Sequence, residues 1–166
     1  LATVDRLIDV AGVGYAPHGG FSAEGRDVDP TDLADIVRVA LLCNDAILRE
    51  SSEQSGEWKL EGDPTEGALL TLAFKAGLDP HFEAEALPRI DVIPVESEHR
   101  FMATLHHDHG GHVFAFVKGA PERIIGMCSM QRKGGQDRPI DTTFWYARIE
   151  ALAAEGFRVL ALAAKP

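Results

Sequence analysis

Residues 101–118, FMATLHHDHGGHVFAFVK, predict an antiparallel β-hairpin, and this hairpin decides the fold class. Two stretches of alternating and apolar residues, 101–106 and 112–118, flank the polar, glycine-containing turn 108–111. Turns of this composition are typical of the tight connections between antiparallel strands. Because residues 113–117 are apolar throughout, we expect both faces of the second strand to be buried.

Further elements are predicted on both sides of the hairpin. Pro88 to Val95 has the composition of a strand that precedes it, and Phe157 to Ala163 that of a final strand. Between them, Pro121 begins a short helix, and a longer helix covers Thr142 to Ala154 before Gly156 ends it.

The first half of the chain is predicted to be mainly helical. Val4 to Tyr15 is rich in β-forming residues but is interrupted by glycine. Asp29, followed by proline, begins a helix that we expect to reach about Leu48. Asp63, again followed by proline, begins a second helix that ends at Gly77.

These elements together predict an α+β fold, an antiparallel-rich β-sheet flanked by helices, in a single domain of residues 1–166. The chain has 166 residues and a hydrophobic content of 45%, which suits one globular domain. It does not begin with methionine, so we expect it to be a fragment of a larger protein. No apolar run approaches the ~20 residues of a membrane-spanning helix, and the start does not resemble a signal peptide.

The net charge narrows the class of partner, and the cysteines indicate the redox compartment. With 26 acidic and 16 basic side chains, the formal charge is −10, which argues against nucleic acid as a partner. Cys43 and Cys128 are isolated, as expected of free thiols in a reducing cytosol.

Four histidines between residues 106 and 112 raise the alternative of a metal site. Zinc ligands must converge on one point. His106 and His107 would point to opposite faces of a strand, and His109 lies in the turn. We therefore expect a solvated hairpin tip and no bound metal.

Five separated segments carry a resemblance to a known family. They are Cys43-Asn44-Asp45, Gly62–Leu69, Ile93–Thr104, Phe116–Glu122 and Gly156–Ala163. In this order and spacing they resemble the nucleotide-binding domain of type II P-type ATPases, the cation pumps of the calcium and sodium–potassium group, and most closely its bacterial members. The resemblance covers nearly the whole chain and implies the architecture of that domain, with ATP as its ligand.

The resemblance also implies site residues. Glu66 corresponds to the glutamate that accepts a hydrogen bond from the adenine amino group. Lys118 would line the base of the ATP pocket and Arg158 would face the phosphates, with Arg100 as a second basic residue and Met102 as an apolar contact. The matching segments place four further residues at the nucleotide: Ser97, Gly119, Ala120 and Leu160.

The residues themselves agree in part and leave alternatives open. Lys118 ends an apolar strand beside Gly119, where a ligand can approach the backbone closely. Arg158, which we expect on a strand among apolar neighbours, would need an anionic partner. Either cation could instead be a solvated strand end. Glu66 could complete a capping box with the cap residue three positions earlier, and segment 43–45 could serve helix packing and turn chemistry.

The family normally has phenylalanine, on which adenine stacks, at the position of Val95. Valine keeps an apolar contact but loses the stacking, which is worth about 1–3 kcal/mol per base in nucleic-acid sites. Phe101 is not expected to replace it, because an extended backbone would point its ring away from Arg100 and Met102. We therefore expect ATP binding to be weak or less selective for adenine.

The chain contains no Asp-Lys-Thr-Gly-Thr phosphorylation motif, so no catalytic residue is predicted in it. The resemblance places that motif and the Mg²⁺ ligands elsewhere in the pump. The expected partners are then ATP and the pump's phosphorylation and actuator domains, on the cytoplasmic side of a membrane that this domain does not contact. Two alternatives remain: a regulatory or protein-interaction module with weakened nucleotide binding, and a free-standing hydrolase, for which we find no nucleophile–base pair.

Overall fold

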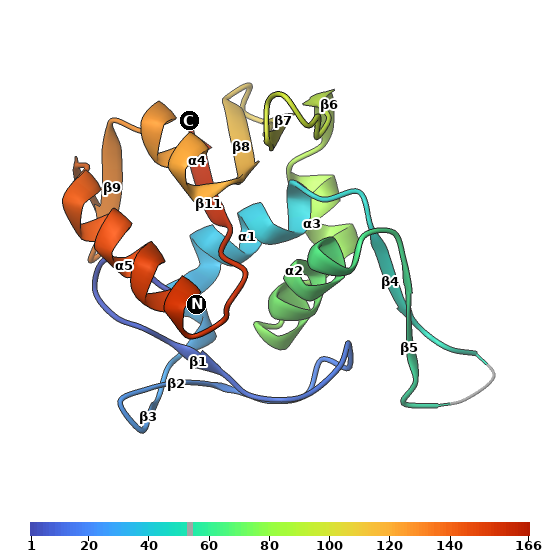
Figure 1. The fold of residues 1–166 in the computed structure, drawn as a ribbon. Coiled ribbons are helices and arrows are strands. Elements are labelled where there is room, and N and C mark those ends of the chain that lie inside the picture. Colours follow the sequence, from blue (N-terminus) through green and yellow to red (C-terminus); the bar gives the residue numbers. More distant parts are fainter. Residues whose placement is uncertain (53–54) are drawn as a thin grey trace.

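The computed structural model describes residues 1–52 and 55–166 and confirms an α+β fold with antiparallel strands (Figure 1). The strands are β1 (Asp9–Val10), β2 (Phe21–Ala23), β3 (Arg26–Asp27), β4 (Ile47–Glu50), β5 (Trp58–Glu61), β6 (Arg89–Ile93), β7 (Phe101–His107), β8 (Val113–Gly119), β9 (Met130–Lys133), β10 (Gln136–Pro139) and β11 (Ala161–Lys165). The helices are the 3₁₀-helix η1 (Pro30–Leu33), α1 (Ala34–Leu42), α2 (Pro64–Lys75), α3 (Pro80–Ala86), α4 (Pro121–Met127) and α5 (Thr142–Ala154).

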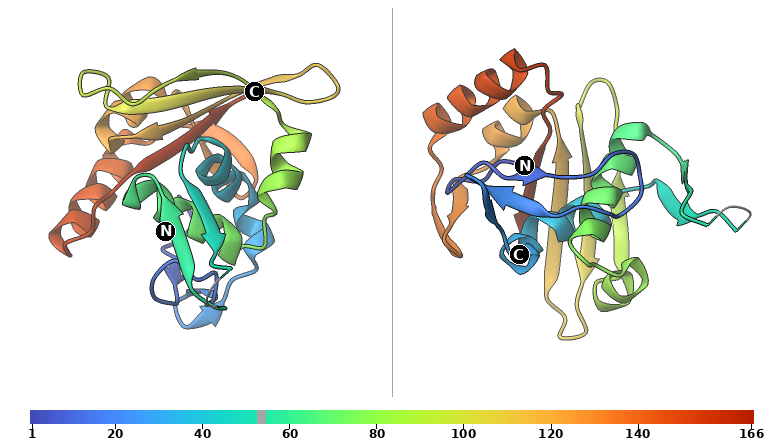
Figure 2. Two further views of the ribbon diagram at one scale, coloured as in Figure 1. Left: turned by 90° about the vertical axis from the view of Figure 1, so that its right-hand side faces the viewer. Right: turned by 90° about the horizontal axis from the view of Figure 1, so that it is seen from below.

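The predicted hairpin is the centre of the main sheet. Strands β7 and β8 pair antiparallel, with Met102 opposite Lys118 and His107 opposite Val113. β6 and β11 pair with their outer edges, which gives the order β11-β8-β7-β6. Seen from the side, this sheet forms the upper layer and α1, α2 and α3 lie below it (Figure 2).

Helix α1 is the central core element, because its apolar residues contribute to all three core clusters. Val37 packs with Ile8 and Phe21, whereas Val39 packs with Met102 and Phe116 under the sheet. Leu41 belongs to a third cluster with residues of β4 and α2. A helix that is apolar on most of its surface is expected to be buried on several sides.

Helix α2 begins and ends as its sequence predicts. The Asp63 side chain accepts hydrogen bonds from the backbone N–H groups of Thr65 and Glu66, at 2.8 and 3.2 Å, and Pro64 is the first helical residue. Gly77 follows the helix with a φ of 84°, a left-handed conformation that favours glycine.

The first long helix is shorter than predicted, since α1 ends at Leu42 and Leu48 lies in β4. The side-chain amide of Asn44 donates to the Ala40 carbonyl at 3.1 Å. A continuing helix would give that carbonyl to the backbone N–H of Asn44, and short polar side chains compete with the helix in this way. The chain then turns and Leu48 is buried on a strand.

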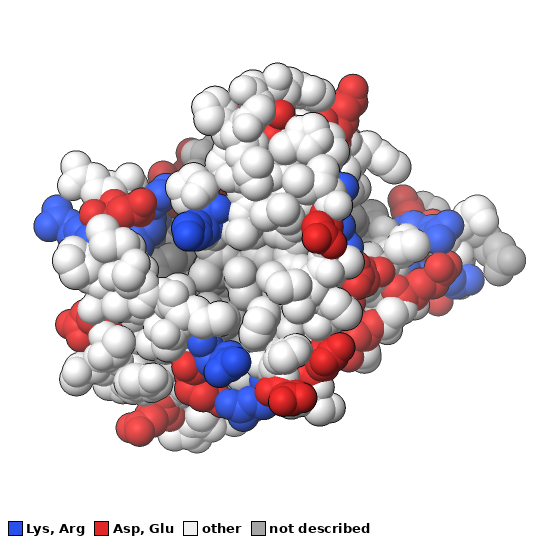
Figure 3. All heavy atoms as spheres, turned by 90° about the horizontal axis from the view of Figure 1, so that it is seen from above, with Lys and Arg blue, Asp and Glu red and all other residues white. Residues whose placement is uncertain are grey.

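Two predictions about the sheet are wrong. The final strand begins at Ala161, so Arg158 lies before it and is exposed. The outer face of the sheet is also not fully buried: Val113 is 47% exposed and Val117 is partly exposed. Seen from above, the middle of this face carries few charged side chains and most of them lie around its rim (Figure 3).

Several short elements were not predicted from the sequence. They are the β4–β5 hairpin, α3 and the β9–β10 hairpin. The predicted β-rich start contains one strand, β1, and an isolated bridge between Ala2 and Leu7. Within the described residues, no helix is both long and apolar enough to cross a membrane.

Candidate functional site

The centre of the candidate site is an ion pair between β8 and α2. The Lys118 ammonium contacts Glu66 Oε1, and the two side chains are 6% and 17% exposed. Lys118 is the penultimate residue of β8. Its side chain lies on the same face of the strand as that of Phe116, the face that packs on α1. A buried ammonium is tolerated where an opposite charge compensates its desolvation. The solvated-cation alternative is therefore wrong for Lys118.

Glu66 lies in the first turn of α2, and the contacts of its carboxylate show that completing a capping box is not its sole role. Oε1 also accepts a 3.4 Å hydrogen bond from the backbone N–H of Asp45. Asp63 caps the helix as predicted, but the Glu66 carboxylate turns to Lys118 and Asp45. The hydrogen bonds from the Glu66 and Thr65 amides, together with the charge of Arg158, hold the pKa of Asp63 below its usual value.

Gly119 and Ala120 form a close backbone junction beside this pair. A Cβ atom on Gly119 would lie 2.5 Å from the Arg100 carbonyl oxygen and 2.7 Å from Phe101 Cα. The backbone N–H of Ala120 donates to the same Arg100 carbonyl at 3.0 Å. Glycine is required here because neighbouring backbone occupies the space of a side chain.

The loop between β6 and β7 places Val95, Ser97 and Arg100 at the surface. Val95 is 62% exposed. Arg100 has a φ of 56°, and its guanidinium lies 2.6 Å from Glu122 Oε1. The exclusion of Phe101 as a stacking ring assumed an extended backbone through Arg100, and the backbone is not extended at that residue.

The remaining predicted residues differ in burial. Met102 is 1% exposed and packs with Cys43 and Phe116 in the core under the sheet. Burial raises the pKa of the Cys43 thiol. Leu160 is partly buried in the segment before β11, and the exposed Arg158 is close enough to Asp63 to act on its pKa.

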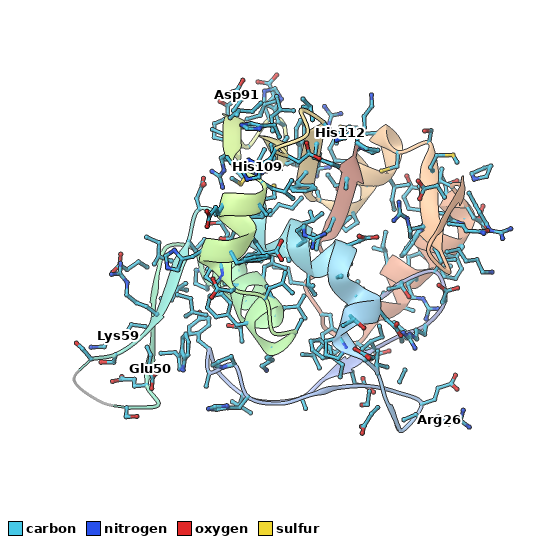
Figure 4. The ribbon with its side chains drawn as sticks, turned by 180° about the vertical axis from the view of Figure 1, so that it is seen from behind. Arg26, Glu50, Lys59, Asp91, His109 and His112 are labelled. Carbon is cyan, nitrogen blue, oxygen red and sulfur yellow. The ribbon has the colours of Figure 1, made fainter. Side chains whose placement is uncertain are left out.

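His106 and His107 lie on opposite faces of β7, as the alternation predicts, but the expectation of a solvated position is wrong for His106. His106 is buried, with its ring nitrogens 2.8 Å from the Leu87 carbonyl and from Thr104 Oγ1. Burial lowers the pKa of His106. His109 and His112, labelled in Figure 4, are exposed, and His112 Nδ1 is 2.8 Å from Asp108 Oδ2. Among the described residues, no three potential ligands gather into a metal site.

Sequence reasoning missed the residues that support Glu66 from behind. The Asn44 side chain donates to the Glu66 backbone carbonyl at 3.0 Å, and Arg89 contacts the segment that contains Asn44. Asn44 is 8% exposed. The one sequence feature that pointed to this support was segment 43–45, in which two polar residues directly follow an apolar helix. From the sequence alone, this segment was expected to serve helix packing and turn chemistry. Its turn chemistry is confirmed.

The arrangement places the Glu66 carboxylate against the buried cation Lys118, with the exposed Arg158 near Asp63, the cap of the same helix. A carboxylate offers about four acceptor positions. Both described contacts of the Glu66 carboxylate use Oε1, so Oε2 can accept a hydrogen bond from a ligand amine. Surface hollows exist beside β4, lined by residues such as Trp58, Phe74 and Leu87, and their linings include neither Glu66 nor Lys118.

Comparison with known proteins identifies the family of the chain. Residues 32–166 match the family model described as P-type ATPase, cytoplasmic domain N. The chain is 39% identical to the cation-transporting ATPase pma1 of Synechocystis sp. and 38% identical to the probable cation-transporting ATPase F of Mycobacterium bovis, over 95% and 93% of this chain but only 18% and 17% of those proteins. It is 29% identical to a calcium-transporting ATPase of Bacillus subtilis over 95% of this chain and 18% of that protein. The chain therefore belongs to the family of cytoplasmic N domains of P-type ATPases.

Proposed function

We propose that this domain binds ATP for a cation-transporting P-type ATPase and positions it for phosphoryl transfer to an aspartate in a separate domain. The observation that carries the proposal is the buried pair of Lys118 and Glu66 beside the Gly119 junction. The pair lies in two of the segments that carry the family resemblance, 62–69 and 116–122.

The chemistry of the residues around the Lys118–Glu66 pair suits an adenine nucleotide. Glu66 Oε2 is free to accept from an exocyclic amine, and the rigid attachment of Glu66 to Lys118 and Asp45 fixes its direction. The Lys118 stem gives an apolar surface, and Arg158 supplies an exposed cation for phosphate. Ser97, Arg100, Met102, Ala120 and Leu160 remain proposed nucleotide residues by family position.

The parent pump would supply what this chain lacks. We assign the acceptor aspartate and the Mg²⁺ ligands to its phosphorylation domain, which with the actuator domain would be the partner of this domain on the cytoplasmic side of the membrane. Mg²⁺ bound to ATP neutralises phosphate charge during transfer. The work of this domain is then to hold and deliver ATP, and closure between domains supplies proximity.

An ATP titration of the isolated domain tests the proposal. We expect saturable amide shifts at Glu66, Lys118 and Arg158 in NMR spectra, no phosphate release, and weaker binding in Glu66→Gln. Arg49→Ala is the matched control, because Arg49 pairs with Glu61 on the exposed β4–β5 hairpin, at 3.2 Å. Shifts confined to other surfaces, or an unchanged affinity in Glu66→Gln, would contradict the assignment.

A second function, a regulatory or protein-interaction module, is favoured by the 62% exposed valine at position 95, which offers no ring for adenine. This alternative predicts no saturable ATP shifts at all. The same titration therefore separates the two functions.

A further inference from the structure

We propose that Arg89 is a positioning residue for the Glu66 carboxylate, acting through the turn segment 42–45. The inference rests on the proposed role of Glu66 in nucleotide binding. Arg89 lies in none of the segments that carry the family resemblance, and its side chain is 32% exposed.

The first step is the contact between Arg89 and the end of α1. Its Nη2 donates to the carbonyl oxygens of Leu42 and Asn44, at 3.1 and 2.7 Å, and its Nη1 lies 2.6 Å from Asp45 Oδ1. The last carbonyls of a helix have no partner within it. A glycine commonly ends a helix in a conformation that satisfies them, but here Asn44 follows Cys43 and the guanidinium takes that place.

The second step leads from this segment to Glu66. The Asn44 side chain donates to the Glu66 backbone carbonyl at 3.0 Å, and the Asp45 N–H donates to Glu66 Oε1 at 3.4 Å. Asn44 Oδ1 also accepts from the Ala46 N–H at 3.0 Å, which closes the turn. The segment thus holds Glu66 at both its backbone and its carboxylate.

The third step is the position of Arg89 in the sheet. Arg89 begins β6, the strand whose other end leads into the exposed loop with Val95. One planar guanidinium therefore ties β6 to the end of α1 and to the turn segment 42–45, which in turn contacts Glu66 at the start of α2. Lysine cannot reproduce these three bonds, since its ammonium lacks the rigid fork of arginine.

Arg89→Ala, Glu66→Gln and the double variant, compared by calorimetric ATP titration, test the inference. We expect Arg89→Ala to weaken binding about tenfold, within the range of coupling between residues of one network. The double variant should then bind as weakly as Glu66→Gln alone, because Arg89 acts through Glu66. Arg89→Lys should fall between wild type and Arg89→Ala.

A second variant covers the case in which Arg89→Ala does not fold. Asp45→Ala removes one Arg89 contact, and its carboxylate is 55% exposed, so the fold is expected to tolerate the change. It keeps its own N–H, whose NMR shift and exchange rate report the bond to Glu66. We expect this amide to shift in Arg89→Ala and to exchange faster in both Arg89→Ala and Asp45→Ala, but to do neither in the control Arg49→Ala.

The outcomes separate this inference from the proposed function. Additive losses in the double variant, or wild-type affinity in Arg89→Ala, would overturn the role of Arg89 while ATP binding stands. If wild type shows no ATP binding, the proposed function fails, and the residue-45 amide still decides the positioning: an unchanged amide in Arg89→Ala overturns it.

Discussion

Two regions of the candidate site contrast with each other. In the first, where α2 meets β8, Lys118 is 6% exposed, and Glu66 is held by Lys118 and by the side chain of Asn44 and the backbone of Asp45. In the second, the loop of residues 94–100, Val95 is 62% exposed and Arg100 pairs with Glu122, both about half exposed. The two regions meet at Gly119, whose neighbours include Arg100 and Lys118.

The difference shows which part of the site the core fixes. The first region is continuous with the core cluster of Met102 and Phe116, so its geometry is set by folding. The side chains of the loop are mostly exposed, so packing in the core does not fix their positions. Substitutions in the loop should then change binding strength alone, whereas substitutions at the buried pair should change stability as well as binding.

The largest expected effect is on stability in Lys118→Met. Removing the ammonium leaves the Glu66 carboxylate buried without its partner, which costs about 3–5 kcal/mol in unfolding free energy. Urea unfolding measures this. Replacing both residues, in Lys118→Met with Glu66→Gln, should recover part of the loss. The exposed control Arg49→Met should cost less than about 1 kcal/mol of unfolding free energy. An equal cost for Lys118→Met and Arg49→Met would show that the buried pair does not set the stability of this region.

The next effect is at the junction of the two regions. Gly119→Ala forces a Cβ atom to 2.5 Å from the Arg100 carbonyl, so the strands must shift, at about 1–3 kcal/mol. Gly126→Ala in α4 has the opposite sign, because a Cβ there meets nothing within 4 Å and the helix gains about 0.5–1 kcal/mol. Thermal unfolding of both variants checks the pair of signs. A stable Gly119→Ala would show that the junction can open.

The loop can be changed for affinity without changing stability. Val95→Phe should strengthen ATP binding about tenfold, since a stacked base is worth about 1–3 kcal/mol. The unfolding free energy should change by less than about 0.5 kcal/mol, because the side chain is exposed. Val113→Phe is the calorimetric control, because Val113 is also exposed but begins β8, at the end of the strand away from Lys118. Equal ATP affinity in wild type and Val95→Phe would sink the stacking hypothesis.

The smallest effect concerns the cap that begins α2. Asp63→Ala should cost about 1 kcal/mol at pH 7, whereas Asp63→Asn should keep most of the stability, because asparagine also caps helices. The pKa of Asp63 is lower in the folded state, so its contribution is present above about pH 4 and is lost as the pH falls further. Urea unfolding between pH 5 and pH 3 should show the Asp63→Ala deficit shrinking. A constant deficit would mean that the carboxylate charge is not involved.

Local patterns predicted the hairpin, the start and end of α2, and the α+β class. These depend on turn composition, capping residues and alternation, which act over a few neighbouring residues. The end of α1 was missed because Asn44 competes for the Ala40 carbonyl through its side chain, a contact that helical periodicity does not contain. The place of Arg158 was missed because apolar neighbours resemble a strand whether or not a partner strand pairs with them.

The sequence by itself determined the family, the elements at the main sheet and which residue types are available for a nucleotide. Only the tertiary structure decided that Lys118 is buried on Glu66, that Gly119 is required by the Arg100 backbone, and that Arg89 holds the turn behind Glu66. The physical reason is separation along the chain. Lys118 and Glu66 are 52 positions apart and Arg89 and Asp45 are 44 apart, so their pairing exists only once the sheet has packed on α1.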